Sequence, residues 1–169
     1  MASSELLIDA FGRIRETVHA VTRDLTAEEL SLRLDPDANS IAWLVWHLTR
    51  IQDDHLADAA EIEQVWVARG WREKFDLPFP ADDTGYGHSG ADVAAVRVGS
   101  PQLLTGYYDA VHEQTIRYVR GLGDPDLARI VDERWDPPVT LGVRLISVVS
   151  DDLQHAGQAA FIRGSIRRR

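Results

Sequence analysis

The stretch that decides the fold is Asn39-Ser40-Ile41-Ala42-Trp43-Leu44-Val45-Trp46-His47-Leu48, an almost wholly apolar run that begins with two favoured N-cap residues. The pattern predicts a helix from Asn39 or Ser40 to about Ala68, ended by Gly70. A helix that is apolar on every side has to be buried. We therefore expect the first half of this helix to lie deep in the domain and its acidic second half to lie nearer the surface.

Three further stretches carry apolar residues at three- and four-residue spacing, which is typical of amphipathic helices. They run from about Ser4 to Arg23, from Ser100-Pro101 to Gly121, and from Thr140 to about Gly164. In the last stretch the apolar pattern is carried by Val143, Ile146, Val149, Leu153 and Phe161. Four helices of this length predict an all-α fold, a four-helix bundle formed by residues 1–169 as a single domain.

The connections between these helices differ in length and composition. Between the second and third helices, residues 70–99 contain Pro78, Pro80 and several glycines, which predicts a long crossover loop. Loops of this length are often lids or binding loops. Residues 129–140 are expected to be extended, as a short strand pair before the last helix. An earlier short helix is indicated by the capping box of Thr26 and Glu29.

Composition excludes several classes of site. The 169 residues contain no cysteine, which excludes disulfides, thiolate metal sites and a cysteine nucleophile. The net charge of -9 argues against binding to nucleic acid, because phosphate contacts need a basic surface. The first residues lack the layout of a signal peptide, and no apolar run is long enough to span a bilayer. We therefore expect a soluble cytoplasmic protein that does not act at a membrane.

Two histidines on apolar helices are candidate metal ligands. His47 lies in the second helix, and His155 lies in the fourth, four residues after Asp151, so that these two share one helix face. Asp152, three residues before His155, is an alternative partner. Helical bundles build metal sites from side chains one turn apart on one helix together with side chains from a facing helix. Gly157 lacks a side chain and is expected to allow the two helices to approach closely.

The run 39–48, taken together with His155-Ala156-Gly157-Gln158, resembles the DinB-like superfamily over essentially the whole chain. Within it, the chain is most similar to the actinobacterial mycothiol-transferase branch, which includes maleylpyruvate-isomerase-like metal-binding proteins. In that family three histidines typically bind one divalent metal. His47 and His155 match two of them, whereas Asp151 stands at the third position. Two histidines and a carboxylate suit zinc, and also iron(II), manganese or nickel. Alternatively, the site has lost its metal.

The resemblance implies a metal-dependent S-transferase that activates a low-molecular-weight thiol, mycothiol, for attack on a small electrophile. The metal would hold the sulfur as thiolate. Two other functions stay open: a metal-assisted hydrolase, and a non-enzymatic, stress-associated bundle whose site is structural or vestigial. The partners implied are small molecules, and the chain is expected to be a monomer or a homodimer.

Four more residues are candidates for supporting roles near the metal or the substrate. Arg50 could bind an anionic substrate group or form an ion pair with Asp53 or Asp54. Asp54 could instead orient a ligand, and Gln158 could hydrogen-bond to one. His88 could join a lid over the metal, although an exposed loop histidine is the favoured interpretation. The tryptophans are expected to fill the core; those considered are Trp43, Trp46, Trp66 and Trp135.

Overall fold

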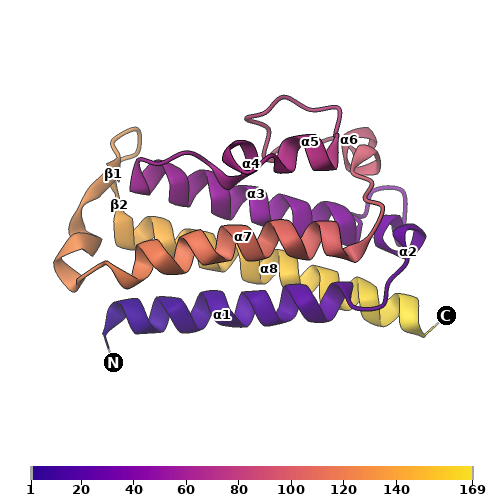
Figure 1. Cartoon of the computed structure of the whole chain (residues 1–169), viewed down its shortest axis with the longest axis horizontal. Coiled ribbons are helices and arrows are strands. Elements are labelled where there is room, and N and C mark those ends of the chain that lie inside the picture. Colours follow the sequence, from indigo (N-terminus) through magenta and orange to yellow (C-terminus); the bar gives the residue numbers. More distant parts are fainter. Residues whose placement is uncertain (1, 169) are drawn as a thin grey trace.

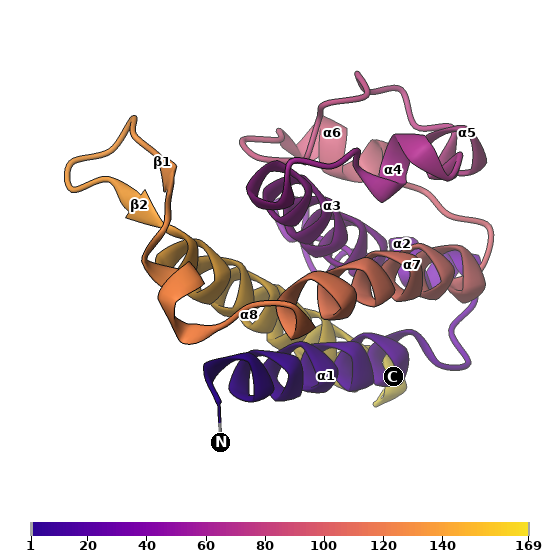
Figure 2. The same cartoon turned by 60° about the vertical axis from the view of Figure 1, so that its left-hand side comes forward.

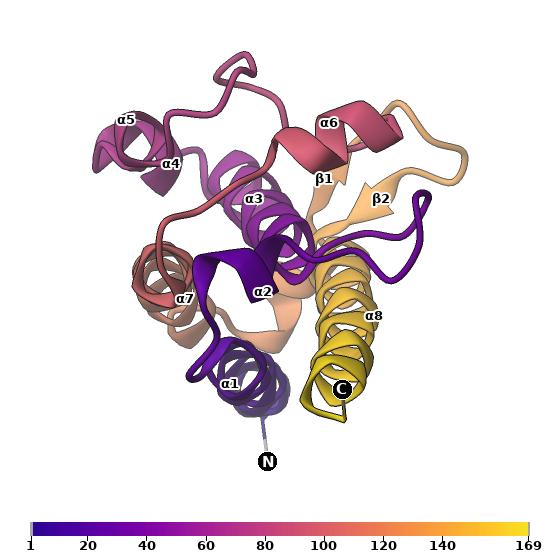
Figure 3. The ribbon, with the colours of Figure 1, turned by 90° about the vertical axis from the view of Figure 1, so that its right-hand side faces the viewer.

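A computed structural model describes residues 2–168, and it is predominantly α-helical, as the sequence predicted. Four long helices dominate it: α1 (Ser3–Thr22), α3 (Ile41–Ala60), α7 (Pro101–Arg120) and α8 (Leu141–Arg167) (Figure 1). Viewed from the end they form a square, in which α3 and α1 occupy opposite corners and each contacts both α7 and α8 (Figure 3).

The remaining elements are short and lie around this square. They are α2 (Ala27–Ser31), α4 (Val65–Ala68), α5 (Trp71–Phe75), α6 (Gly90–Ala95), the 3-10 helix η1 (Asp124–Ala128), β1 (Ile130–Asp132) and β2 (Val139–Thr140). The two strands pair antiparallel, with Ile130 opposite Thr140, and project beside the start of α8 (Figure 2). Among the described residues, no helix is both long enough and apolar enough to cross a bilayer.

The starts of the long helices follow from local chemistry. The Ser40 hydroxyl accepts a hydrogen bond from the Trp43 amide at 3.1 Å, and the Thr140 hydroxyl accepts one from the Val143 amide at 3.3 Å. Pro101 occupies the first turn of α7, where its missing N–H costs nothing. The predicted starts near these residues are confirmed.

The predicted end of the second helix at Ala68 is wrong, because α3 stops at Ala60. Glu61 adopts a left-handed conformation with φ of 55°, and the chain folds back. The buried Asp53 carboxylate then accepts hydrogen bonds from the amides of Val65 and Trp66, at 2.9 and 2.8 Å, and so fixes the start of α4. A contact across twelve residues, rather than a local signal, ends the helix.

The connection between α3 and α7 is also more structured than a loop. It contains α4, α5 and α6, which lie along the outer side of α3 (Figures 1 and 3). Residues 76–89 and 96–100 carry no helix or strand. This connection therefore covers the helix that carries His47.

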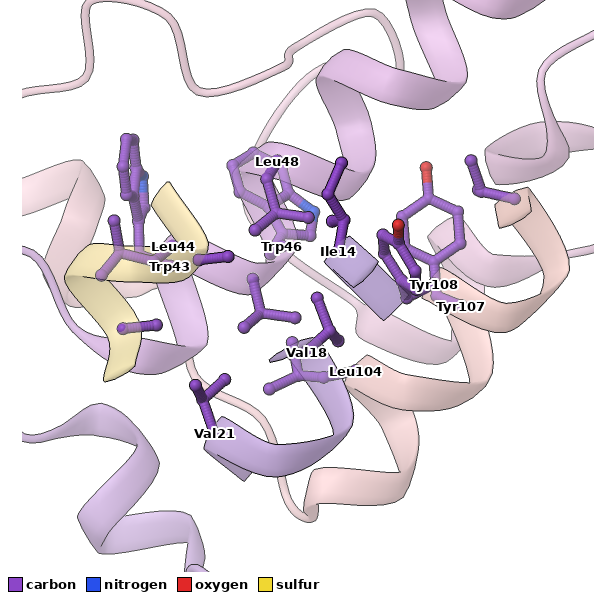
Figure 4. Close-up of a cluster of buried hydrophobic side chains, with 14 of the residues drawn as sticks. Ile14, Val18, Val21, Trp43, Leu44, Trp46, Leu48, Leu104, Tyr107 and Tyr108 are labelled. Atoms are coloured by element: carbon purple, nitrogen blue, oxygen red, sulfur yellow. The ribbon is translucent and has the colours of Figure 1, made fainter. Parts of the chain in front are cut away.

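The core is a single cluster of buried apolar side chains contributed by all four long helices. Figure 4 shows its central part, where Trp46 and Leu48 of α3 face Ile14 and Val18 of α1, with Tyr108 of α7 nearby. Trp43, Trp46 and Trp66 are buried as expected. Trp135 is 64% exposed, so its expected place in the core is wrong; it lies in the turn between β1 and β2, away from the helices.

The sequence pattern predicted the wrong face of α8 as the buried one. Of the five apolar residues that carried it, Val143, Ile146, Leu153 and Phe161 are exposed and only Val149 is buried. The buried face of α8 is instead formed by Leu141, Leu145, Val148, Val149, Asp152, Ala156, Ala159, Ile162 and Ile166. Because this helix is apolar on both sides, periodicity alone does not show which side meets the core.

Candidate metal centre

His47, Asp151 and His155 come together where α3 packs against α8. Each side chain offers one ligand atom, and these atoms all lie within 4.8 Å of one another. Donor atoms of a tetrahedral site, at about 2.0–2.2 Å from the ion, stand about 3.3–3.6 Å apart, so the three side chains would draw slightly closer around an ion. The structure thus brings together the three residues that the sequence singled out, as a group that could hold a metal ion.

His47 is held rigidly. Its side chain is buried, and its ring stacks on Trp43 with centroids 4.5 Å apart and planes 13° apart. Its Nδ1 lies 2.5 Å from the carbonyl oxygen of Thr84. Because a carbonyl can only accept, Nδ1 carries the proton and Nε2 keeps its lone pair. A backbone carbonyl that fixes the tautomer in this way is the usual outer partner of a metal-binding histidine.

His155 is oriented in the same manner from its own helix. Its Nδ1 donates to the carbonyl oxygen of Asp151 at 2.8 Å, which again leaves Nε2 with the lone pair. The ring meets that of His47 edge to face, with centroids 4.7 Å apart. Both imidazoles therefore present an unprotonated nitrogen, which is the form that binds metal.

Asp151 supplies the negative charge of the group. Its Oδ2 is buried and accepts no hydrogen bond from the described residues, although it lies 3.3 Å from Nδ1 of His155. An unpartnered buried carboxylate oxygen is costly unless something else binds it. This orphaned oxygen, beside two imidazole lone pairs, is what a divalent cation would satisfy, so the residues fit a metal.

The electrostatics of the three residues are coupled. Burial lowers the pKa of His47, and its hydrogen bond to Thr84 offsets this only in part. Burial acts against the charge of His155 too, but the side chain and carbonyl of Asp151 outweigh it and raise the pKa of this ring. Burial would raise the pKa of Asp151, yet the neighbouring rings of His155 and His47 outweigh it and lower that pKa.

Two features that the sequence analysis missed shape the site from the crossover connection. The Thr84 carbonyl fixes His47, and Gly85 comes so close that a Cβ there would stand 2.9 Å from Nδ1 of His47 and 2.9 Å from the Trp46 ring. Gly85 also has a φ of 90°, which favours glycine. The available signal was the glycine-rich run around Tyr86, but nothing local indicated where it would lie.

Comparisons with known proteins identify the family of the chain. The family model described as Mycothiol-S-transferase matches residues 6–168. The chain belongs to this family. The family is part of the DinB-like superfamily, so the resemblance seen in the sequence is confirmed.

A solved structure carries the same fold. It is described as the conserved protein of locus from Enterococcus faecalis, and it is 30% identical to this family member. The match covers 96% of both chains with a TM-score of 0.90. A comparison with curated proteins gives no match.

His88 is not the exposed loop histidine that we expected from the sequence. Only 7% of its side chain is exposed, because it packs between Phe79 and Trp46. Its Nδ1 accepts a hydrogen bond from Nε1 of Trp43 at 3.1 Å, and its Nε2 lies 3.0 Å from both carboxylate oxygens of Asp83. Both nitrogens are thus engaged, and His88 fastens the crossover connection onto α3.

Arg50 does not face the site either. It is fully buried and donates to the carbonyls of Ala81 and Asp83, to Gln64 and to the Tyr107 hydroxyl. Of the two ion pairs considered, the structure has the one with Asp53, at 3.7 Å. No guanidinium N–H group is directed to a substrate, so Arg50 holds the crossover connection rather than an anionic ligand.

The other candidates do not belong to the group of three ligand residues. Asp54 accepts a hydrogen bond from Gln64 at 2.8 Å, and Gln158 is exposed on α8. Asp152 is fully buried, neither of its oxygens has a partner among the described residues, and burial raises its pKa well above the ordinary value. Gly157 does not provide the expected close approach, because a Cβ there would meet nothing within 4 Å.

Proposed function

We propose that this family member is a divalent-metal-dependent S-transferase whose ligands are His47, Asp151 and His155. The observation that carries the proposal is the buried, unpartnered Oδ2 of Asp151 beside the unprotonated Nε2 atoms of two histidines. The family match supports a thiol as the co-substrate, and mycothiol is the thiol named by it. Zinc is the proposed metal, and iron(II), manganese and nickel accept the same ligands.

The bound ion would hold the sulfur of the thiol as thiolate, since a coordinating thiol is deprotonated. The protein orients the ligand atoms: the carbonyls of Thr84 and Asp151 keep the proton of each neutral ring on Nδ1, so that Nε2 of the neutral ring carries the lone pair. The single charge of Asp151 leaves a dipositive ion with a net positive charge of about one, which favours an anionic sulfur over a neutral one.

The exposed side of the site determines where substrates enter. His47 is covered by the Trp43 ring and the segment around Thr84, and it is 5% exposed. The side chains of His155 and Asp151 are 18% and 36% exposed. We infer that thiol and electrophile approach from the α8 side, while the α3 side excludes water.

The test is turnover by the full chain, loaded with zinc, using mycothiol and 1-chloro-2,4-dinitrobenzene. We expect formation of the thioether to require both metal and thiol, to be abolished in His155→Ala and to persist in His55→Ala. His55 is a suitable control because it lies on α3 with its Nδ1 3.2 Å from Arg144 and not in the metal group.

Two results would overturn the proposal in different ways. Metal-dependent hydrolysis of ester or amide substrates without any thiol would indicate a hydrolase. A chain that binds no divalent metal and turns over no substrate would indicate a binding or stress-associated bundle with a vestigial site.

A further inference from the structure

We propose that a groove beside the metal centre binds the electrophile and selects uncharged, apolar acceptors. The inference rests on the proposed transferase function, and it adds the class of substrate. The groove has a volume of about 440 Å³ and lies between α3, α8 and the segment that joins α2 to α3. None of the three proposed ligands lines this groove or a larger hollow of about 760 Å³ beside α2, but of the two it is the groove that has lining residues one helical turn from a ligand.

The groove continues the same seam that holds the metal ligands. Leu44 lines it from α3, three residues before His47, and Gln158 lines it from α8, three residues after His155. Three residues correspond to about 4.5 Å along a helix axis. On both helices the wall of the groove is therefore one turn from a ligand, and a small molecule lying in it reaches the metal centre with its near end.

The lining of the groove is apolar and uncharged. The apolar side chains in the lining are those of Leu34, Ala38, Leu44, Phe161 and Ile162, and the polar side chains are two neutral amides. Phe161 is 67% exposed, which leaves an aromatic face available to a ligand. A flat, apolar molecule would cover this surface and remove it from water.

The two arginines next to the groove do not line it, and their guanidinium groups donate to backbone carbonyls. Arg33 precedes Leu34, and its guanidinium donates to backbone carbonyls that include those of Ala38 and Gly90. Arg163 follows Ile162, and it donates to the carbonyls of Val21 and Arg23. A carboxylate at the end of the groove away from the metal would lose water without gaining a cationic partner from the lining, which is unfavourable. The groove therefore discriminates against acidic acceptors.

The same lining argues against the thiol as occupant. Mycothiol is a sugar-based thiol whose hydroxyl groups need hydrogen-bond partners, and the groove offers only the side-chain amides of Asn39 and Gln158. With an aryl chloride in the groove, the C–S bond forms while the C–Cl bond breaks. Chloride leaves with the bonding electrons, and the proton of the thiol passes to solvent.

Gly157 provides a specific way to block the groove. It belongs to the lining, and a Cβ there would meet nothing within 4 Å, so a leucine side chain would enter the groove without displacing the core. Gly12 is a matched control, because it also lies inside a long helix, its Cβ position is equally open, and it does not line the groove. Gly157→Leu and Gly12→Leu therefore differ in whether the new side chain enters the groove.

The experiment is calorimetric titration of the full chain, as purified with its metal, with 1,3-dinitrobenzene and with 3,5-dinitrobenzoate. We expect dinitrobenzene to bind at least about tenfold more weakly to Gly157→Leu than to the wild type, and equally to Gly12→Leu. Dinitrobenzoate is expected to bind the wild type at least about tenfold more weakly than dinitrobenzene does. Phe161→Ser, which changes an exposed side chain, is expected to weaken dinitrobenzene binding as well.

The groove proposal is overturned if dinitrobenzene does not bind, if Gly157→Leu binds it normally, or if dinitrobenzoate binds as tightly and is lost equally in Gly157→Leu. These ligands do not react, so the titration separates the two proposals. Binding that Gly157→Leu abolishes, in a chain without thiol-dependent turnover, supports the groove and refutes the transferase. Turnover with an unchanged Km for 1-chloro-2,4-dinitrobenzene in Gly157→Leu supports the transferase and refutes the groove.

Discussion

Helix α3 contributes residues to two polar clusters, which differ in whether their polar atoms are satisfied by hydrogen bonds. The closed cluster consists of Arg50, Asp53, Gln64 and Tyr107, and the open cluster consists of His47, Asp151 and His155. In the closed cluster the Arg50 guanidinium donates hydrogen bonds to four acceptors. The Asp53 carboxylate accepts hydrogen bonds from two backbone amides and, at 2.8 Å, from the Tyr107 hydroxyl. In the open cluster, Oδ2 of Asp151 has no hydrogen-bond partner among the described residues, although it lies 3.3 Å from Nδ1 of His155.

The comparison separates a structural role from a ligand-binding one. Buried polar groups that satisfy one another hold chain segments together, and the closed cluster ties α4, α7 and the crossover connection to α3. Buried groups that leave lone pairs near one point need a partner that the chain does not supply. The open cluster therefore fits the proposed metal site, whereas the closed cluster, only one turn further along α3, fits a structural role.

Removing Arg50 is expected to have the largest effect. Arg50→Ala leaves the buried Asp53 without its cation and frees the crossover carbonyls, so we expect a loss of about 3–5 kcal/mol in the free energy of unfolding. Urea denaturation measures this. Arg13→Ala, which removes an exposed ion pair with Asp9, serves as the control and should leave the midpoint unchanged. A loss below about 1 kcal/mol in Arg50→Ala would mean that the closed cluster does not hold the fold.

The contact of the crossover connection with the open cluster can be tested at two glycines. Gly85→Ala places a Cβ 2.9 Å from His47, whereas Gly87→Ala adds a Cβ that meets nothing within 4 Å. Both residues have positive φ, at 90° and 76°, so both variants place an alanine in a backbone conformation that favours glycine. We expect Gly85→Ala to bind zinc about tenfold more weakly than Gly87→Ala, because the Thr84 carbonyl is displaced from His47. Equal zinc affinities would show that the Thr84 carbonyl does not orient the ligand.

Removing the charge of Asp151 tests whether this residue is a metal ligand. Asp151→Asn keeps the shape and removes the charge, and we expect zinc affinity to fall about tenfold or more while the metal-free fold keeps its stability. Asp54→Asn is the matched control on the facing helix, since Asp54 is exposed to a similar extent and bonds to Gln64. Zinc affinity that is the same in both variants would exclude Asp151 as the third ligand.

The smallest effect concerns pH. The pKa of His155 is raised above 6.5, so this ring is protonated at a higher pH than an ordinary histidine and then cannot bind metal. Zinc affinity should fall as the pH drops from about 8 to about 6. In Asp151→Asn, which removes the carboxylate that raises the pKa of His155, the fall should begin at lower pH. Titrations at several pH values would show this, and a flat profile would contradict it.

In the metal-free chain the same shifts act on stability. The raised pKa of His155 contributes stability that is present below pH 6.5 and is lost as the pH rises through its folded pKa. The lowered pKa of His47 contributes stability above pH 6.5 that is lost as the pH falls through its folded pKa. The two effects oppose each other.

The features that the sequence predicted correctly are those determined by residues within one or two helical turns. The starts of α3, α7 and α8 follow from Ser40, Pro101 and Thr140, each acting within one turn. The spacing of Asp151 and His155 on one helix likewise needed no tertiary information. The family resemblance added that His47 should face them.

What the sequence did not predict depends on contacts between distant segments. The end of α3 at Ala60 depends on Asp53 bonding to the start of α4. The burial of His88 depends on Trp43 and Asp83, which hold it from two sides. The buried side of α8 is set by packing on α3 and α1, and its apolar pattern allowed either side.

The central claim is that His47, Asp151 and His155 form a metal site, and calorimetric titration of the chelator-treated full chain with zinc tests it most directly. We predict one zinc ion per chain in the wild type and in His55→Ala, and binding at least about 100-fold weaker in His47→Ala and His155→Ala. Absence of zinc binding in the wild type, or binding that survives unchanged in both of the latter variants, would contradict the account.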